Sequence, residues 1–150
     1  MVYFGIKRII DIILSFVGLI VLSPLFLLLA IAIKIDSKGP VFFSQQRVGL
    51  NKTYFQILKY RTMRIDTPSD IPTHLLSKPD MYITKVGKFL RKTSLDELPQ
   101  IINILKGEMA VIGPRPALWN QVDLIAERDK YQKNGRTVND LRPGLTGWAQ

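Results

Sequence analysis

The apolar residues of this chain are concentrated near its N-terminus. From Ile12 to Ile33 there are 22 consecutive residues without a formal charge, and most of them are Leu, Ile, Val or Phe. A straight helix of that length reaches about 33 Å, which is enough to cross the hydrocarbon core of a bilayer. A cleaved signal peptide fits poorly, because its apolar part is shorter and a small-residue cleavage site should follow it. The pattern therefore predicts a membrane helix.

Two features argue against a simple transmembrane span. Ser23-Pro24 lies in the middle of the run, where a proline removes a backbone hydrogen bond and bends a helix. The Ser23 hydroxyl could satisfy a carbonyl freed by that bend. A spanning helix usually has its Lys/Arg excess on one side, but here both flanks are basic. These observations leave open a re-entrant helix that returns to the same face and a spanning helix with a kink. The flanking residues are Lys7, Arg8, Lys34 and Lys38.

Residues 39–150 have the pattern of a globular domain that mixes helices and strands. Short β-type runs at 41–43 and 54–60 flank Gly49-Leu50-Asn51-Lys52, which predicts a hairpin. The rest of the pattern predicts a loop at 67–79, a basic helix at 85–92, a helix at 100–106 closed by Gly107, and a strand at 109–112.

The longest amphipathic pattern covers residues 117–133, which predicts a helix there. Its inward-facing residues are expected to be Leu118, Val122, Ile125 and Tyr131. The final stretch, 141–150, is rich in turn residues and predicts no regular element. We therefore expect an α+β protein with a membrane helix and its flanks at 1–38 and a small α/β domain at 39–150.

Composition limits the chemistry that this domain can perform. The chain has 21 Lys+Arg and 12 Asp+Glu, which gives a net charge of +9, and it has no Cys. Cysteine-ligated metals, disulfides and thiol nucleophiles are therefore excluded. A single histidine, His74, excludes sites with several His ligands, and we assign it no role. The positive charge indicates an anionic partner, which could be an anionic membrane, a phosphorylated small molecule or nucleic acid.

Adjacent carboxylates occur in the segment Thr93–Pro99. Ser94 and Glu97 match a capping box for a helix start, and spacing alone favours this interpretation. In a rival register, Asp96 is the cap and Pro99 lies in the first helical turn. A catalytic interpretation is also open, with one carboxylate acting as a nucleophile and the other holding a hard cation such as Mg²⁺.

Many cations accompany this acidic pair, and Arg115 differs from the rest. It lies between Pro114 and Pro116, which stiffen its backbone and suit it to present a two-pronged donor to phosphate. The other basic residues alone indicate a solvated face or contact with anionic lipid. They are Arg47, Lys59, Arg61, Arg64, Lys85, Lys88, Arg91 and Lys92.

The segment 84–116, TKVGKFLRKTSLDELPQIINILKGEMAVIGPRP, resembles the signature of the bacterial sugar transferases. These are monotopic enzymes that transfer a sugar phosphate to a polyprenyl phosphate. The resemblance covers nearly the whole chain. It extends to Lys7-Arg8, Ser23-Pro24, the hairpin KGPVFFSQQRVGLN, the segment Lys59–Met63, and RPGLTGWAQ.

The resemblance implies a two-step exchange. Asp96 would attack the sugar-bearing phosphate of a UDP-sugar and expel UMP, and the phosphate of a polyprenyl carrier would then attack the aspartyl-phosphosugar. Glu97 would bind Mg²⁺ or Mn²⁺, and Ser23-Pro24 would be the break of a re-entrant membrane helix. The residues assigned to substrate or phosphate binding are Lys59, Arg61, Arg91, Arg115 and Arg142.

The same resemblance implies the setting of the reaction. The enzyme would act on the cytoplasmic face of the bacterial inner membrane, with a UDP-sugar, a polyprenyl phosphate and membrane lipid as its partners and no nucleic acid. The overall pattern is closest to capsule-type enzymes that use N-acetylated amino sugars, and the chain could form a homo-oligomer. Family members continue beyond the WAQ segment, so we expect this chain to be C-terminally shorter than they are. The alternative is a non-enzymatic, membrane-anchored basic adaptor that binds anionic lipid or a partner protein.

Overall fold

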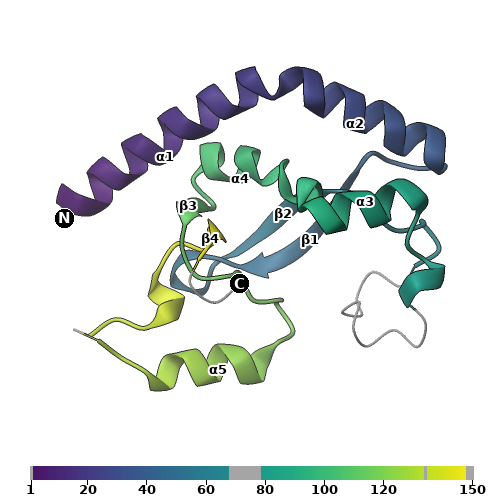
Figure 1. Ribbon diagram of the computed structural model, residues 1–150. Coiled ribbons are helices and arrows are strands. Elements are labelled where there is room, and N and C mark those ends of the chain that lie inside the picture. The colour runs from purple at the N-terminus through teal and green to yellow at the C-terminus, as the bar shows by residue number, and fades with distance from the viewer. Residues whose placement is uncertain (1, 68–78, 134, 148–150) are drawn as a thin grey trace. The chain divides into compact units, whose positions relative to one another are not determined.

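Helices and strands are both present in the computed structural model, which describes residues 2–67, 79–133 and 135–147 (Figure 1). The mixture agrees with the expected α+β class. The chain divides into two compact units. Unit 1 comprises residues 1–20, 46–57 and 100–150, and unit 2 comprises residues 21–45 and 58–99. The two units are defined by contacts between residues of the chain. The expected boundary at residue 38 is of another kind, since it separates a membrane segment from a domain in water, and it stays a prediction.

Two apolar helices form the N-terminal part of the chain, α1 (Val2–Val21) and α2 (Ser23–Asp36). Among the described residues, no single helix is long and apolar enough to cross a membrane. The pair Gly5–Val21 and Ser23–Asp36 meets that condition together, with a 62° bend at the break. Pro24 lies in the first turn of α2, where its missing N–H costs no helical hydrogen bond. A dependence of the bend on Ser23-Pro24 remains a prediction.

A polar stripe on α1 bonds to other parts of unit 1. Arg8 donates hydrogen bonds to the carbonyl oxygens of Ile104 (2.5 Å) and Leu105 (2.9 Å), close to the C-terminal end of α4 (Gln100–Lys106). Asp11 is buried, and its Oδ1 accepts a hydrogen bond of 3.2 Å from the backbone N–H of Val111. The other oxygen, Oδ2, pairs with Lys7 Nζ at 3.0 Å. The polar side chains of α1 thus bond to the backbone of both α4 and β3.

The expected hairpin is confirmed. Strands β1 (Phe42–Val48) and β2 (Tyr54–Tyr60) form a two-stranded sheet. Their connection uses left-handed backbone at Asn51 (φ 50°) and Lys52 (φ 61°), and it is closed by a hydrogen bond from Gly49 N to Thr53 O at 2.6 Å. Asparagine tolerates this conformation better than most residues do, which suits it to the tight turn.

A second sheet pairs β3 (Ala110–Ile112) with β4 (Gly144–Thr146) in parallel. β3 agrees with the expected strand, but the expectation of no regular element after residue 141 was wrong. A side chain at Gly144 would overlap the backbone nitrogen of Gly113, and a side chain at Gly113 would overlap the backbone around Gly144. The two backbone segments therefore approach this closely only because both residues are glycines. A strand of three residues created by such a contact leaves little hydrophobic pattern in the sequence.

The longest expected helix is shorter than its pattern. Helix α5 covers only Val122–Lys130, and the segment before it is not helical. Leu118 is buried as expected, but Val122 is 68% exposed and Tyr131 is 70% exposed, so their inward-facing assignment was wrong. The N–H of Leu118 donates to Gln121 Oε1 at 2.9 Å, in a turn that delays the start of the helix.

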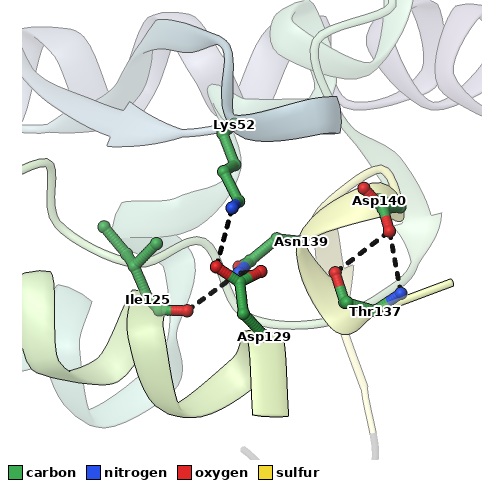
Figure 2. A network of polar contacts seen from close by, with 6 residues as sticks. All are labelled: Lys52, Ile125, Asp129, Thr137, Asn139 and Asp140. Atoms are coloured by element: carbon green, nitrogen blue, oxygen red, sulfur yellow. Dashed lines mark hydrogen bonds and ion pairs between the residues drawn. The ribbon is translucent and has the colours of Figure 1, made fainter. Parts of the chain in front are cut away.

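A polar network holds α5 to two loops of unit 1 (Figure 2). Asp129 accepts from Lys52 Nζ at 2.7 Å through one oxygen and from Asn139 Nδ2 at 2.8 Å through the other. Asn139 also donates to the carbonyl oxygen of Ile125 at 2.9 Å. The hydrogen bonds from Lys52 and Asn139 lower the pKa of Asp129. The network ties the β1–β2 turn and the 3₁₀ helix Val138–Asp140 to α5.

Candidate active site

The acidic pair Asp96-Glu97 lies in a 3₁₀ helix, Leu95–Glu97, which belongs to unit 2. Leu95 and Leu98 flank the pair, and both pack against a buried apolar cluster of the same unit. We call residues 94–99 the Asp96 turn. Because its apolar side chains are anchored in the cluster, the carboxylates are presented from a fixed backbone. The cluster consists of Leu29, Ile33, Tyr60 and Leu90.

Helix α3 (Lys85–Thr93) leads into the Asp96 turn and ends at Ser94. Ser94 has left-handed backbone (φ 57°), and its N–H donates to the carbonyl oxygen of Arg91 at 3.3 Å. A capping residue at a helix start needs extended backbone and a side-chain hydrogen bond, and Ser94 has neither. The capping-box interpretation was therefore wrong, because Ser94 terminates the preceding helix.

The rival register is also wrong for Asp96, which lies inside the 3₁₀ helix and not at a helix cap. Pro99 comes closer to expectation, since it directly precedes Gln100, the first residue of α4. Neither local explanation therefore accounts for two adjacent carboxylates here. The residues that surround the pair in unit 2 include the cations Lys59 and Arg91.

Glu97 forms an ion pair with Lys59. Its Oε1 lies 2.6 Å from Lys59 Nζ, and the two side chains are 23% and 17% exposed respectively. Lys59 is the penultimate residue of β2, so the pair links the hairpin to the Asp96 turn. Partial burial strengthens the attraction relative to an ion pair at the surface.

Asp96 lies in a mixed electrostatic environment. Burial raises the pKa of its carboxyl above the ordinary value, and the neighbouring Glu97 carboxylate also raises it. The ammonium group of Lys59 and the guanidinium group of Arg91 act in the opposite direction and lower this pKa. The two cations therefore favour the ionised carboxylate, which is the form able to act as a nucleophile.

Arg91 reaches the Asp96 turn from α3. Burial lowers the pKa of its guanidinium group, and the charge of Asp96 opposes that effect. Arg91 Nε donates a hydrogen bond of 2.9 Å to Thr62 Oγ1. Thr62 was not among the expected site residues. Its only signal in the sequence was its position inside the Lys59–Met63 segment that carries the family resemblance.

Arg61 has a different environment from Lys59 and Arg91. Its guanidinium group is buried and donates to Ser37 O at 2.8 Å, to Ser37 Oγ at 2.9 Å and to Lys38 O. These acceptors lie at the C-terminal end of α2, where carbonyl groups lack helical partners. Arg61 thus secures the end of α2, and its assignment to phosphate binding stays a prediction.

The remaining expected phosphate ligands, Arg115 and Arg142, belong to unit 1. Arg115 is exposed, and its carbonyl oxygen accepts a hydrogen bond of 2.9 Å from Arg128 Nη2. Arg142 is half-buried, and its Nε has no hydrogen-bond partner among the described residues. An unpaired guanidinium N–H is suited to an anion, but the assignment of both residues stays a prediction.

The donor set of the Asp96 turn is compatible with a divalent cation. No group of three or more His, Asp or Glu side chains that could hold a metal occurs in the described part of the chain. Mg²⁺, however, is commonly held by one or two carboxylates together with substrate phosphates. Asp96 and Glu97 supply two carboxylates whose repulsion a cation would relieve. In this structure Lys59 is the cation that contacts Glu97.

Comparison with known proteins identifies the family. The model of the family described as bacterial sugar transferase matches residues 2–150. The chain belongs to the bacterial sugar transferases. This agrees with the resemblance carried by the segments around Asp96, Lys59 and Ser23-Pro24.

Curated bacterial sugar transferases share about two fifths of their residues with the chain. It is 40% identical over 149 residues to an undecaprenyl-phosphate glucose phosphotransferase from Komagataeibacter xylinus, covering 96% of this chain and 27% of that protein. It is 40% identical over 147 residues to an Escherichia coli UDP-glucose:undecaprenyl-phosphate glucose-1-phosphate transferase, covering 96% of this chain and 30% of that protein. It is also 40% identical over 149 residues to an Aeromonas hydrophila UDP-N-acetylgalactosamine-undecaprenyl-phosphate N-acetylgalactosaminephosphotransferase, covering 99% of this chain and 34% of that protein. The chain thus spans about a third of the length of these relatives or less.

The Lys59–Glu97 pair yields a prediction about the ionisation of Asp96. Lys59→Met removes the ammonium group that lowers the pKa of Asp96, so this pKa is expected to rise. A carbon-13 NMR titration of the Asp96 carboxyl measures the change. Lys88→Met, on an exposed part of α3, is the control and should leave the titration unchanged. An unchanged or lower pKa in Lys59→Met contradicts the assigned electrostatics.

Proposed function

We propose that this chain carries the catalytic chemistry of a sugar-1-phosphate transferase that uses a UDP-sugar donor and a polyprenyl phosphate acceptor and releases UMP. The observation that carries the proposal is the Asp96 turn. There a half-buried carboxylate adjoins a second acid; burial raises the pKa of Asp96, and the charges of Lys59 and Arg91 oppose that rise. Membership of the bacterial sugar transferases supports the same reaction class.

In the first proposed step, an ionised Asp96 oxygen attacks the phosphorus that bears the sugar. A P–O bond to Asp96 forms as the bond to the departing UMP breaks, and UMP leaves with the electron pair of that bond. In the second step, a phosphate oxygen of the polyprenyl carrier attacks the same phosphorus and releases the Asp96 carboxylate. The product is a polyprenyl-diphosphate sugar, and Asp96 is regenerated. Covalent catalysis allows two bulky substrates to use one site in turn.

Charge neutralisation is the main requirement of both steps, since a carboxylate must approach a polyanion. Lys59 and Arg91 are the protein cations whose charges act on Asp96. We propose that Glu97, beside the nucleophile Asp96, also holds Mg²⁺ or Mn²⁺. Such an ion supplies Lewis-acid stabilisation to phosphate oxygens. Glu97 must then share its carboxylate between the ion and Lys59, which now lies 2.6 Å from it.

The sugar is proposed to be an N-acetylated amino sugar, on the basis of the overall sequence pattern. The similar relatives include a protein named for N-acetylgalactosamine and proteins named for glucose, all at 40% identity. A panel of UDP-sugars assayed for UMP release with a short polyprenyl phosphate decides between them. Release from UDP-glucose alone contradicts the amino-sugar proposal.

We also propose that α1 and α2 form a re-entrant membrane element on the cytoplasmic face of the bacterial inner membrane. The support is physical: both helices expose many large apolar side chains, which water would solvate poorly. Basic residues flank the apolar run at both ends. This position would keep the carrier phosphate at the interface while its tail stays in lipid.

Replacement of the nucleophile tests the reaction. Asp96→Asn removes the ionisable oxygen, so UMP release should fall by about three orders of magnitude or more, as for loss of other covalent nucleophiles. Intact-mass spectrometry with donor and no acceptor should show a phosphosugar adduct on the unaltered enzyme but not on the variant. Asp80→Asn, at an exposed acid of unit 2, is the matched control. Turnover that survives in Asp96→Asn refutes the mechanism and favours the adaptor alternative.

Removal of divalent cations tests the metal proposal. Excess chelator is expected to abolish UMP release, and added Mg²⁺ or Mn²⁺ should restore it, because the substrate phosphates would otherwise repel the carboxylate. A calcium-loaded chelator controls for direct inhibition. Full turnover in excess chelator removes the metal from the mechanism.

The bend between α1 and α2 can be tested separately. The double substitution Ser23→Ala and Pro24→Ala is expected to favour a continuous helix, since Ala restores the N–H and has the highest helix propensity. A cysteine introduced at Gly5 should then become accessible to a membrane-impermeant reagent from the periplasmic side. Introduction of the same cysteine into the otherwise unaltered chain gives the reference. Equal labelling of both chains argues against Ser23-Pro24 as the cause of the bend.

A further inference from the structure

Helix α3 has one face in the core of unit 2 and one face in solvent. Leu90 is fully buried in the apolar cluster, whereas three lysines on the other side of the helix are exposed and follow one another at spacings of three and four residues. An exposed phenylalanine lies among them on the helix surface. We call these four residues the lysine face of α3. They are Lys85, Lys88, Phe89 and Lys92.

The stability of α3 does not explain its lysine face. Lys88 and Lys92 are four residues apart, where like charges on a helix repel each other. Lys85 is the first residue of α3, where the helix dipole disfavours a cation. In the part of the chain that the structure describes, none of the three lysines forms an ion pair, and Phe89 is 54% exposed. A surface that is anionic and partly apolar would complement this face.

Phe89 extends the apolar surface of α3 out of the core. Arg91 points towards the segment that follows β2, since its Nε donates to Thr62 Oγ1 at 2.9 Å. Positions 89 and 91 are about 200° apart around a helix, so Phe89 lies on the opposite flank. On that flank, apolar surface continues from Val86, which packs against the cluster, to the ring of Phe89 in solvent. An apolar ring beside lysines is typical of helix surfaces that rest in a bilayer interface.

The start of α3 is held at the end of α2. Asp36 Oδ2 accepts a hydrogen bond of 2.9 Å from the backbone N–H of Val86. The last turn of α2 and the residues after it add two exposed cations, Lys34 and Lys38, and Ile35 between them is 81% exposed. Because α2 belongs to the proposed membrane element, this junction lies where that element leaves the bilayer. Lipid headgroups are therefore the anions that the lysine face meets first.

We propose that the lysine face of α3 is a contact surface for anionic phospholipid. The three ammonium groups bind headgroup phosphates, and the ring of Phe89 enters the interface beside them. This contact is separate from the re-entrant element, and it holds the Asp96 turn, into which α3 leads, at the bilayer surface. The proposal rests on the membrane placement of α1 and α2 under the proposed function, but not on the transferase reaction.

The test uses the full chain in nanodiscs with a probe at residue 89. Since the chain contains no cysteine, Phe89→Cys provides a single site for an environment-sensitive fluorophore. Discs of phosphatidylcholine with roughly 30% phosphatidylglycerol are compared with discs of phosphatidylcholine alone. In the anionic discs the emission should shift to shorter wavelength, and lipids with a nitroxide near the headgroup should quench it. Both effects should be much weaker in the neutral discs. Val122→Cys, at an exposed apolar position of α5, is the control and should show no dependence on phosphatidylglycerol.

Charge variants then test the lysines themselves. Lys88→Gln combined with Lys92→Gln removes two exposed cations and keeps a similar helix propensity, so the fold is preserved. The contact with anionic discs should weaken on the order of tenfold or more. Lys130→Gln combined with Lys133→Gln removes the same charge from exposed positions of unit 1 and should leave the quenching unchanged. Salt at about 1 M should mimic the first pair of substitutions, because it shortens the Debye length to about 3 Å.

The outcomes separate this surface from its alternatives. Equal quenching in neutral and anionic discs, or undiminished quenching in the Lys88→Gln and Lys92→Gln chain, overturns the proposal. An emission shift that grows with protein concentration and without quenching by lipid also overturns it, because it indicates a second copy of the chain on this face. If the chain does not insert into nanodiscs, the membrane placement of α1 and α2 fails. Binding of the labelled chain to anionic but not to neutral vesicles then supports the lysine face, and no binding overturns it.

Discussion

Two neighbouring carboxylates that are both shielded from water repel each other, and unit 2 has to offset that repulsion. Burial and Glu97 raise the pKa of Asp96, while Lys59 and Arg91 lower it. The proposed attack on phosphorus requires an ionised Asp96, so it depends on Lys59 and Arg91 opposing the effects of burial and of Glu97. The contacts that bring Lys59 and Arg91 to the Asp96 turn are therefore as important as the acids themselves.

Four consecutive residues at the end of the hairpin, 59–62, each contact a different part of unit 2. Lys59 pairs with Glu97, Tyr60 enters the apolar cluster, Arg61 binds the end of α2 and Thr62 binds Arg91. Successive side chains of an extended chain point in opposite directions, so one short segment can reach helices on either side of it. This accounts for the concentration of polar contacts in so small a part of the sequence.

Local sequence signals predicted the elements that depend on local interactions. The bounds of β2 and α4 and the start of α3 agree with the pattern, because alternation, helical spacing and Gly107 act within a few residues. Three predictions were wrong: a capping box at Ser94, a helix over the whole of 117–133, and no regular element after residue 141. In each case a contact distant in sequence or a competing turn decided the outcome, as with Gly113 and Gly144. The pairing of Lys59 with Glu97 and the contact of Thr62 with Arg91 could not be read from spacing for the same reason.

The hydrogen bonds of α1 have a practical meaning for work with this protein. Arg8 occupies two carbonyl oxygens near the end of α4, and the buried carboxylate of Asp11 accepts the N–H of Val111. The first helix is thus a structural member of unit 1 and not a detachable anchor. Removal of α1 would take hydrogen-bond partners away from the backbone of α4 and β3, so a sample that keeps α1 is the better route to a folded protein.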